Sequence, residues 1–274
     1  MTAKLLPLVP QHTTYCEVFG GGAALLFSKR PSPVEVYNDI DSALYEFFRV
    51  LADSALFEQF HRRVALLPYS RELYDECRAT WEEQTDIVER VWRWYVVARQ
   101  SFGGRFGGGW GLVLAASTRG MAETTSTWIS GLAELPAFHR RVQRVQIEHL
   151  DWRRCLEQYD TPETFFYLDP PYVTETRSAK RYAHELTMAD HVELVERVQV
   201  LTGMVMLSAY PHDLYLPLAA AGWDETRFET ACYAAGRTRA TGIRGDGAAL
   251  RMQARTEVVW RNAACVRGRQ ERLL

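Results

Sequence analysis

A short apolar run leads directly into an acid, two prolines and a tyrosine. The run Thr164–Leu168 has the aromatic and apolar content of a buried strand, and Asp169, Pro170, Pro171 and Tyr172 follow it. Because proline lacks an N–H and restricts the residue before it, the two prolines end the strand and stiffen the turn. A carboxylate and a phenol ring are thereby predicted at the carboxyl end of a strand, where open α/β sheets bind ligands. A rigid turn without a chemical role is the alternative for this motif alone.

A second group of residues suited to ligand binding lies near the N-terminus, where a short apolar strand over 14–19 enters three glycines. Glycines at such a turn let the backbone bend tightly and bring a ligand against bare peptide groups. The loop residues are Glu17, Val18, Phe19, Gly20, Gly21 and Gly22. Three consecutive glycines differ from the spaced dinucleotide fingerprint, so the loop alone is a weak indication of a nucleotide site.

An acidic residue ends the next strand pattern. The alternating run Val34–Asn38 is followed by Asp39, which lies 17 residues after Gly22. This is near the spacing at which an acid after a second strand holds ribose hydroxyls. The alternative is that Asn38 and Asp39 form only a turn and the N-cap of a helix predicted over 40–51.

Together these motifs resemble the Dam-type DNA adenine-N6 methyltransferases, in particular the orphan and phage-borne members. The resemblance runs from Pro10 to Asn262 and includes the segments 206–210 and 255–260. The glycine loop precedes the Asp-Pro-Pro-Tyr box, and a long helical insert separates them, as in the family's alpha group. The resemblance implies a Rossmann-like, S-adenosylmethionine-dependent sheet. It also implies methylation of the exocyclic N6 amine of adenine in a specific double-stranded DNA sequence.

The resemblance implies a role for each motif. Asp169 would accept one N–H of the target amine, the carbonyl of Pro170 would accept the other, and Tyr172 would stack on the base. Because an adenine inside a duplex cannot reach such a pocket, it would be everted. The glycine loop would line the methionine and adenosine parts of the donor, with Asn38 and Asp39 at its ribose.

Further residues are assigned by the same resemblance. Asp151 and Trp152 follow a strand expected over 144–148 and would contact the adenine of the donor. An ordinary helix N-cap is the alternative for Asp151. Ser208 and Tyr210 match a family segment and are expected to shape the pocket.

Two departures from the family pattern concern the donor site. Family members usually carry a Gly-Gly-Lys-like element upstream of the position where this sequence begins. Weakened donor affinity or loss of activity is therefore expected unless the true start lies upstream or Lys4 substitutes in part. Val18 stands where a proline is common. A catalytically silent DNA-binding relative is therefore one alternative. A cytosine-N4 enzyme is another, although such enzymes usually have serine before the two prolines.

The strand and helix patterns predict how these residues are positioned. Their alternation at both ends of the chain favours a largely parallel sheet covered on both faces, with an antiparallel edge formed by 227–232 and 256–261. Between 53 and 143 strand signals give way to helical periodicity. We therefore predict a first part of the catalytic α/β domain at 1–52, a mostly helical target-recognition insert at 53–143, and the second part at 144–274. Glycine fills six positions of 102–111, so this segment is expected to lack regular structure.

Composition excludes several classes of protein. With 274 residues, 47% of them hydrophobic, the chain has enough apolar surface for a full α/β core and a small accessory domain. It has neither a run of about 18 apolar residues nor the start of a secretory signal, so a cytoplasmic protein is expected. The family resemblance implies that it is encoded by a bacterium or a phage. Five scattered cysteines lack metal-binding spacing, so no metal is expected. Surface or loop positions, and not metal-ligating roles, are predicted for His184 and His191.

Positive charge is concentrated near the C-terminus. The net charge is −2, yet nine arginines and only three acids lie between residues 227 and 269. A loop at 235–247 is predicted to order on a phosphate backbone, with a solvated hairpin as the alternative. Segment 102–111 is interpreted either as a DNA-contacting segment or as a flexible connector. The residues predicted to contact double-stranded DNA are Arg105, Arg237, Arg239 and Arg244. The protein is expected to act as a monomer.

Overall fold

A computed structural model of the chain describes residues 1–114, 116–173, 184–231 and 254–270. The chain divides into two units. The first comprises Met1–Tyr45, Arg144–Thr230 and Arg255–Leu274, and the second comprises Glu46–Gln143 and Ala231–Ala254. The loop 235–247, with Arg237, Arg239 and Arg244, lies outside the described residues.

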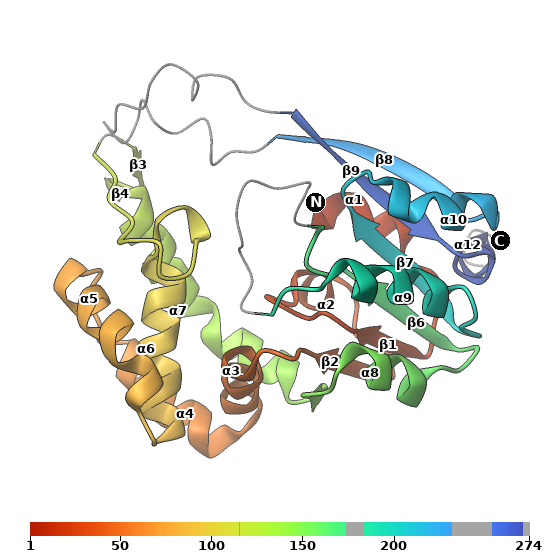
Figure 1. The fold of residues 1–274 in the computed structure, drawn as a ribbon. Helices are drawn as coiled ribbons and strands as arrows, with labels where there is room; N and C mark the ends of the chain where they lie inside the picture. Colours follow the sequence, from red (N-terminus) through yellow and green to blue (C-terminus); the bar gives the residue numbers. More distant parts are fainter. Residues whose placement is uncertain (115, 174–183, 232–253, 271–274) are drawn as a thin grey trace. The chain divides into compact units, whose positions relative to one another are not determined.

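A seven-stranded sheet forms the centre of the first unit (Figure 1), with the strand order β5-β2-β1-β6-β7-β9-β8. The strands are β1 (Thr14–Glu17), β2 (Val34–Asn38), β5 (Gln146–Glu148), β6 (Thr164–Leu168), β7 (Met204–Ala209), β8 (Asp224–Ala231) and β9 (Ala254–Arg261). The pairs β5–β2, β2–β1, β1–β6 and β6–β7 are parallel, whereas β7 and β9 are antiparallel. The predicted Rossmann-like α/β fold, with its antiparallel excursion at the C-terminal edge, is confirmed.

The central strands are covered on both faces, which explains their nearly continuous apolar sequences. Every residue of β6 and β7 is buried, as is typical of strands inside a parallel sheet. Helices α8 (Trp152–Tyr159), α9 (Met188–Val198) and α10 (Leu216–Ala220) contribute side chains to one core cluster with the strands. The shorter α1 (Thr2–Leu5) and α2 (Ala24–Ser28) precede and follow β1 along the chain and contact each other, and α12 (Ala263–Gln270) packs against β7.

The pleat of the sheet separates apolar from polar side chains. Side chains alternate along a strand, so residues two apart share a face. Cys16, Phe166 and Leu168 belong to the apolar core cluster beneath α8, α9 and α10. The register places Glu17 opposite Tyr167, and both side chains therefore take the other face. The polar side chains at the carboxyl ends of these strands consequently gather on one side of the sheet.

The second unit is built mainly from capped helices. These are α4 (Ser54–Val64), α5 (Arg71–Thr80), α6 (Ile87–Gln100) and α7 (Glu123–Val142), and α3 (Ser42–Ala52) crosses from the first unit. Side chains of Asp53, Ser70 and Asp86 accept backbone N–H groups at the starts of α4, α5 and α6, which satisfies donors that have no partner inside a helix. Trp92 and Tyr95 on α6 are buried in this unit.

A short hairpin corrects the expectation that strands are absent between residues 53 and 143. It consists of β3 (Ser117–Thr118) and β4 (Met121–Ala122), which pair antiparallel. Arg119 and Gly120 form its turn with φ angles of 56° and 74°, as a two-residue hairpin turn requires. Strands of two residues are too short to produce a detectable alternation of apolar residues.

The segment 102–111 also differs from the prediction, because its backbone is ordered by hydrogen bonds. It begins with a 3-10 turn, η3 (Phe102–Gly104), and Ser101 and Trp110 form a β-bridge. Gly111 N donates to the Gln100 carbonyl at 2.8 Å, and Phe102 N donates to the Gly109 carbonyl at 2.7 Å. The glycines therefore permit a defined loop instead of an irregular connector. Across the described ranges, no helix is both long and apolar enough to cross a membrane.

Candidate active site

The strand order reverses beside β1, and the candidate site lies at that point. From β1 the sheet grows through β2 in one direction, whereas β6 and β7 extend it in the other. Ligands of open α/β sheets bind in the crevice that such a reversal leaves at the carboxyl ends of the strands. Val18 N donates to the carbonyl of Tyr167 at 3.2 Å. The glycine loop after β1 and the turn that begins at Asp169 therefore leave the sheet side by side.

Hydroxyl groups surround the Asp169 carboxylate. Ser208 Oγ donates to Asp169 Oδ1 at 3.0 Å, and the Tyr167 hydroxyl lies 3.3 Å from the same Oγ. Solvent reaches Asp169, yet the surrounding protein displaces enough water to raise the pKa of its carboxyl to about 6. Hydrogen bonds from Ser208 and Tyr172 act in the opposite direction, because they stabilise the ionised form.

The Tyr172 ring is fixed beside this carboxylate. Its centroid lies 4.4 Å from that of Tyr210, and the two ring planes are inclined by 62°. Such an edge-to-face contact is a favourable arrangement for aromatic pairs. Both rings are half-buried. The predicted pair of carboxylate and phenol is thus present at the end of β6, with Ser208 and Tyr210 from the neighbouring β7 and the residue after it.

The three positions of the glycine loop differ in the space around them and in their backbone conformation. A Cβ on Gly20 would lie 2.2 Å from Cε2 of Tyr37, so no side chain fits there. Gly21 has a φ of 48°, which favours glycine, and its carbonyl accepts a hydrogen bond from the Tyr37 hydroxyl at 3.0 Å. A Cβ on Gly22 would meet no other atom within 4 Å. A Cβ on Gly21 would also meet nothing within 4 Å, so the protein leaves open space at both Gly21 and Gly22, where the sequence predicts a bound ligand.

Asp39 is tied to the glycine loop. Its Oδ2 accepts the Gly21 N–H at 2.8 Å and its Oδ1 accepts the Asp41 N–H at 2.8 Å. Partial burial raises the pKa of Asp39 above its usual value. The cap of the following helix is Asp41, whose Oδ1 accepts the Ala43 N–H at 2.8 Å. The helix begins at Ser42, so capping does not account for Asp39.

Asn38 uses its amide group to join three segments of the first unit. Its Nδ2 donates to the carbonyls of Val18 and Leu150, at 2.9 and 3.1 Å, and its Oδ1 accepts the Leu150 N–H at 2.8 Å. The side chain is buried. Asn38 therefore holds the ends of β1 and β2 against the loop that follows β5.

Glu17 is a buried acid at the end of β1. The residue is only 3% exposed, and burial raises the pKa of its carboxyl to about 8. Its Oε2 accepts hydrogen bonds from the Tyr15 hydroxyl at 2.8 Å and from Leu26 N at 3.1 Å. Asp169 adds a further upward effect through its negative charge, so these two predicted site residues influence each other electrostatically. Val18 and Phe19 continue the chain from Glu17 into the loop, and Val18 is buried.

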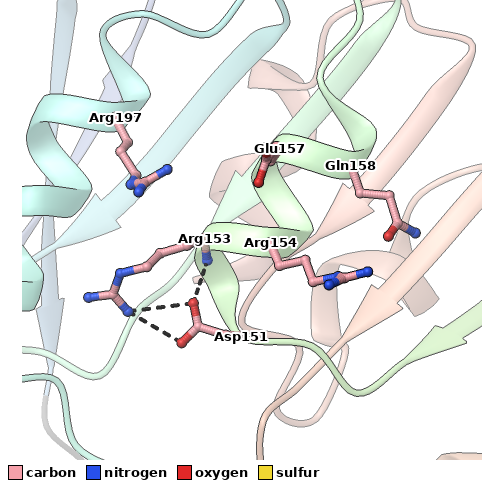
Figure 2. Close-up of a pocket in the computed structure, with 6 residues that line it drawn as sticks. All are labelled: Asp151, Arg153, Arg154, Glu157, Gln158 and Arg197. Carbon is pink, nitrogen blue, oxygen red and sulfur yellow. Dashed lines mark hydrogen bonds and ion pairs between the residues drawn. The ribbon is translucent and has the colours of Figure 1, made fainter.

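Asp151 and Trp152 start helix α8. Asp151 Oδ1 accepts the Arg153 N–H at 2.9 Å, so Asp151 is the N-cap of α8. This is the role that the sequence left open as the alternative to a donor contact. Figure 2 shows Asp151 in a surface pocket, turned toward Arg153, whose Nη1 lies 3.3 Å from Asp151 Oδ2. The residues lining this pocket are Asp151, Arg153, Arg154, Glu157, Gln158 and Arg197. The Trp152 ring is buried 6.4 Å from Phe19, and its Nε1 has no hydrogen-bond partner among the described residues.

Some contributors to the site were missed by sequence reasoning. Tyr167 precedes the Asp-Pro-Pro-Tyr box, but its position on the polar face depends on the register with β1. Glu257 on β9 raises the pKa of Asp169 through its charge, and the pKa of Glu257 is itself raised by burial. The period of two along each strand is the signal that would have identified both residues.

Two further sequence predictions concern Arg105 and His191. Arg105 is exposed on the segment 102–111 of the second unit. His191 is buried on α9, which corrects the prediction of a surface or loop position. It faces the core because it lies three residues before Leu194 on one helical stripe. Over the residues that the structure covers, no three His, Cys, Asp or Glu side chains cluster as metal ligands would.

Comparison with known proteins identifies the family. A family model described as D12 class N6 adenine-specific DNA methyltransferase matches residues 2–208, which is more than half of the 274 residues. A comparison with curated proteins found no match. The matched region contains both the glycine loop and the turn that begins at Asp169. The family description implies methylation of adenine at N6, with DNA as the substrate. On this evidence the chain belongs to the family of D12 class N6 adenine-specific DNA methyltransferases.

Proposed function

We propose that this protein transfers the methyl group of S-adenosylmethionine to N6 of an adenine everted from a specific double-stranded DNA sequence. One observation carries the proposal. The glycine loop and Asp169 follow neighbouring parallel strands, in register, at the point where the strand order reverses. A donor at the loop and a base at the carboxylate would therefore meet in one crevice, which is the geometry that direct methyl transfer requires.

The residues of the first unit fit a positively charged donor. When bound, S-adenosylmethionine supplies a methyl group activated by a sulfonium. Burial raises the pKa of Glu17, Asp39 and Asp169 alike, and the low-dielectric surroundings that cause this also strengthen the attraction between an ionised carboxylate and a cation. We assign Glu17, Phe19 and Gly20–Gly22 to the methionine and adenosine parts and Asp39 to the ribose. Gly22 leaves space for the ligand.

Neighbouring residues support that site indirectly. The amide of Asn38 is already engaged by main-chain groups, so we propose that it positions the loop. Trp152 packs near Phe19 with an indole N–H that has no partner in the described part of the chain, and we assign this ring to the adenine side of the donor. Asp151 caps α8 with one oxygen, and its second oxygen lies 3.3 Å from Arg153 Nη1, so we propose that an adenine contact by Asp151 would replace this partly exposed ion pair.

The amine needs acceptors because its lone pair is delocalised into the purine ring. We propose that Asp169 accepts one of its hydrogens and the Pro170 carbonyl the other, which turns the lone pair toward the methyl group. Pro171 keeps the turn stiff. Tyr172 would stack on the base, a contact worth about 1–3 kcal/mol. Most of the rate enhancement would come from alignment and from a preorganised acceptor for the developing positive charge.

The remaining assignments concern DNA. We propose that residues 53–143 form the target-recognition insert between the two parts of the catalytic domain, 1–52 and 144–274. Arg105 would contact DNA from this insert. Arg237, Arg239 and Arg244 would contact the phosphate backbone, and they lie outside the described residues. Phosphate contacts of this kind position a protein on DNA, whereas base-edge contacts select the sequence.

Incubation of the protein with DNA and donor carrying a labelled methyl group tests the proposal. We expect the label in N6-methyladenine after digestion to nucleosides, at one sequence context that methylation-sensitive sequencing then maps. Label in N4-methylcytosine would support the cytosine alternative. If calorimetry detects no donor binding at high protein concentration while DNA binding persists, the chain is a catalytically silent relative.

A further inference from the structure

A row of polar side chains lies behind Glu17 on the polar face of the sheet. Tyr15 precedes Glu17 by two residues on β1, so both side chains take the same face. The Tyr15 hydroxyl and Leu26 N both donate to Glu17 Oε2. Glu17 Oε1 receives no hydrogen bond from any described residue. One carboxylate oxygen is therefore fixed by the protein, and the orientation of the other follows from it.

A buried cation lies against the tyrosine that holds Glu17. Lys29 Nζ is 4.4 Å from the centroid of the Tyr15 ring, a distance at which cations attract aromatic faces. Lys29 is buried and pairs with Glu35 at 2.5 Å. Its Nζ also donates to Ser32 Oγ at 2.6 Å and to the Arg30 carbonyl at 3.0 Å. A buried lysine persists only with such partners, because an isolated charge is costly to remove from water.

The groups around Glu17 shift the pKa of its carboxyl in opposite directions. Burial raises the pKa of Glu17 to about 8 and the negative charge of Asp169 adds to this, while the hydrogen bonds from Tyr15 and Leu26 and the charge of Lys29 lower it. The titratable groups that face Glu17 from the elements around it are Tyr15 on β1, Tyr37 on β2, Tyr167 and Asp169 at β6, and Lys29 after α2. Tyr15 and Lys29 are the two side chains of this set that favour the ionised carboxylate.

We propose that Tyr15, backed by Lys29, is a positioning residue that orients Glu17 and keeps it available as the anionic partner of the methyl donor. This inference rests on the proposed function, because it takes S-adenosylmethionine as the donor and Glu17 as part of its site. Because burial raises the pKa of Glu17 to about 8, we expect its carboxyl to be mostly protonated in the empty protein at neutral pH. Binding of the cationic donor converts it to the carboxylate, and the proton goes to the buffer.

Calorimetric titration of the full chain with S-adenosylmethionine tests this between about pH 6 and about pH 9, in buffers of different ionisation enthalpy. We expect the affinity of the wild-type protein to rise through a pH of about 8. At about pH 7 binding releases nearly one proton, and Glu17→Gln lacks this release. In Tyr15→Phe we expect the affinity for S-adenosylmethionine to rise at a higher pH than in the wild type. At the alkaline end of the range, the donor affinity of this variant recovers toward the wild-type value.

Tyr37→Phe is the matched control. This buried tyrosine bonds to the Gly21 carbonyl and not to Glu17, so its loss changes affinity equally at every pH. If Tyr15→Phe does not fold, Lys29→Met combined with Glu35→Gln removes the cation without leaving a buried unpaired acid, and the same alkaline shift is expected. A loss of affinity that is uniform across pH in the folded variant overturns the role of Tyr15. Absence of donor binding by the wild-type protein instead overturns the proposed function.

Discussion

At the scale of single residues, Asp169 combines accessibility with a perturbed environment. Solvent reaches it, its Oδ1 accepts from Ser208, and its pKa is raised to about 6. Replacement by alanine removes the acceptor of the amine, so we expect methyl transfer to fall below a few per cent of wild type while the melting temperature and most of the DNA affinity are retained. Label transfer to DNA, thermal unfolding and calorimetry measure the three quantities. Substantial residual transfer would contradict the assigned role.

The same carboxylate should impose an acid limit on catalysis. Protonated Asp169 no longer offers an anionic acceptor, so kcat at saturating donor is expected to fall as the pH drops through about 6 and to level off above it. Measuring kcat at saturating donor separates this effect from the titration of Glu17, which affects donor binding. A kcat profile that is flat between about pH 5 and about pH 7 would show that the ionisation of Asp169 does not limit kcat.

Ser208 provides a sharper test of that profile. Its hydroxyl donates to Asp169 at 3.0 Å and lowers the pKa of the carboxyl. Ser208→Ala removes a bond that favours the ionised form, so we expect the acid limb of kcat to move to higher pH. Ser28→Ala, at an exposed position on α2, is the control and should leave the limb in place. A lower kcat in Ser208→Ala without a displaced limb would indicate a purely steric role.

At the scale of elements, substitutions at two glycines in the turn between β1 and α2 should affect stability and donor binding separately. Gly20→Ala places a methyl group 2.2 Å from the Tyr37 ring, and overpacking of this kind costs about 1–3 kcal/mol. We expect a lower melting temperature for this variant. Gly22→Ala meets no atom within 4 Å, so its stability should match wild type while its donor affinity falls. Unchanged donor affinity in Gly22→Ala would mean that this space is not part of the donor site.

The accuracy of sequence-based prediction also differs between elements. The strands Val34–Asn38 and Thr164–Leu168 were predicted to the residue, because turn-forming residues bound each apolar run. The expected first strand extended to Phe19, but β1 ends at Glu17, where the backbone leaves the sheet to form the glycine loop. The hairpin at 117–122 was missed because its strands are only two residues long.

Within the candidate site, motifs were easier to predict than their supports. Asp169 and the glycine loop stand out in the sequence as short, unusual patterns. Tyr15 and Tyr167 do not, because their roles depend on which face of the sheet they take and on pairing between strands far apart in sequence. The helix cap at Asp41 was also hard to predict from the sequence, because the choice between Asp39 and Asp41 as the cap depends on backbone geometry.

At the scale of the whole molecule, a net charge of −2 leaves little general attraction to DNA, so a few placed arginines must provide it. Arg105 is exposed on a loop whose backbone is held by Gln100, Ser101 and Tyr74. Its guanidinium makes no ion pair with another described residue. Removing the side chain should therefore leave the loop intact and delete one phosphate contact.

We expect Arg105→Ala to weaken DNA binding at low salt and to reduce the slope of log affinity against log salt by about one. Arg62→Ala is the matched control, because Arg62 is also exposed in the second unit but is already paired with Glu58. Fluorescence anisotropy with duplex DNA over a range of salt concentrations measures both slopes. An unchanged slope for Arg105→Ala would exclude the loop from the DNA interface, and the arginines at 237, 239 and 244 would then carry the electrostatic contribution.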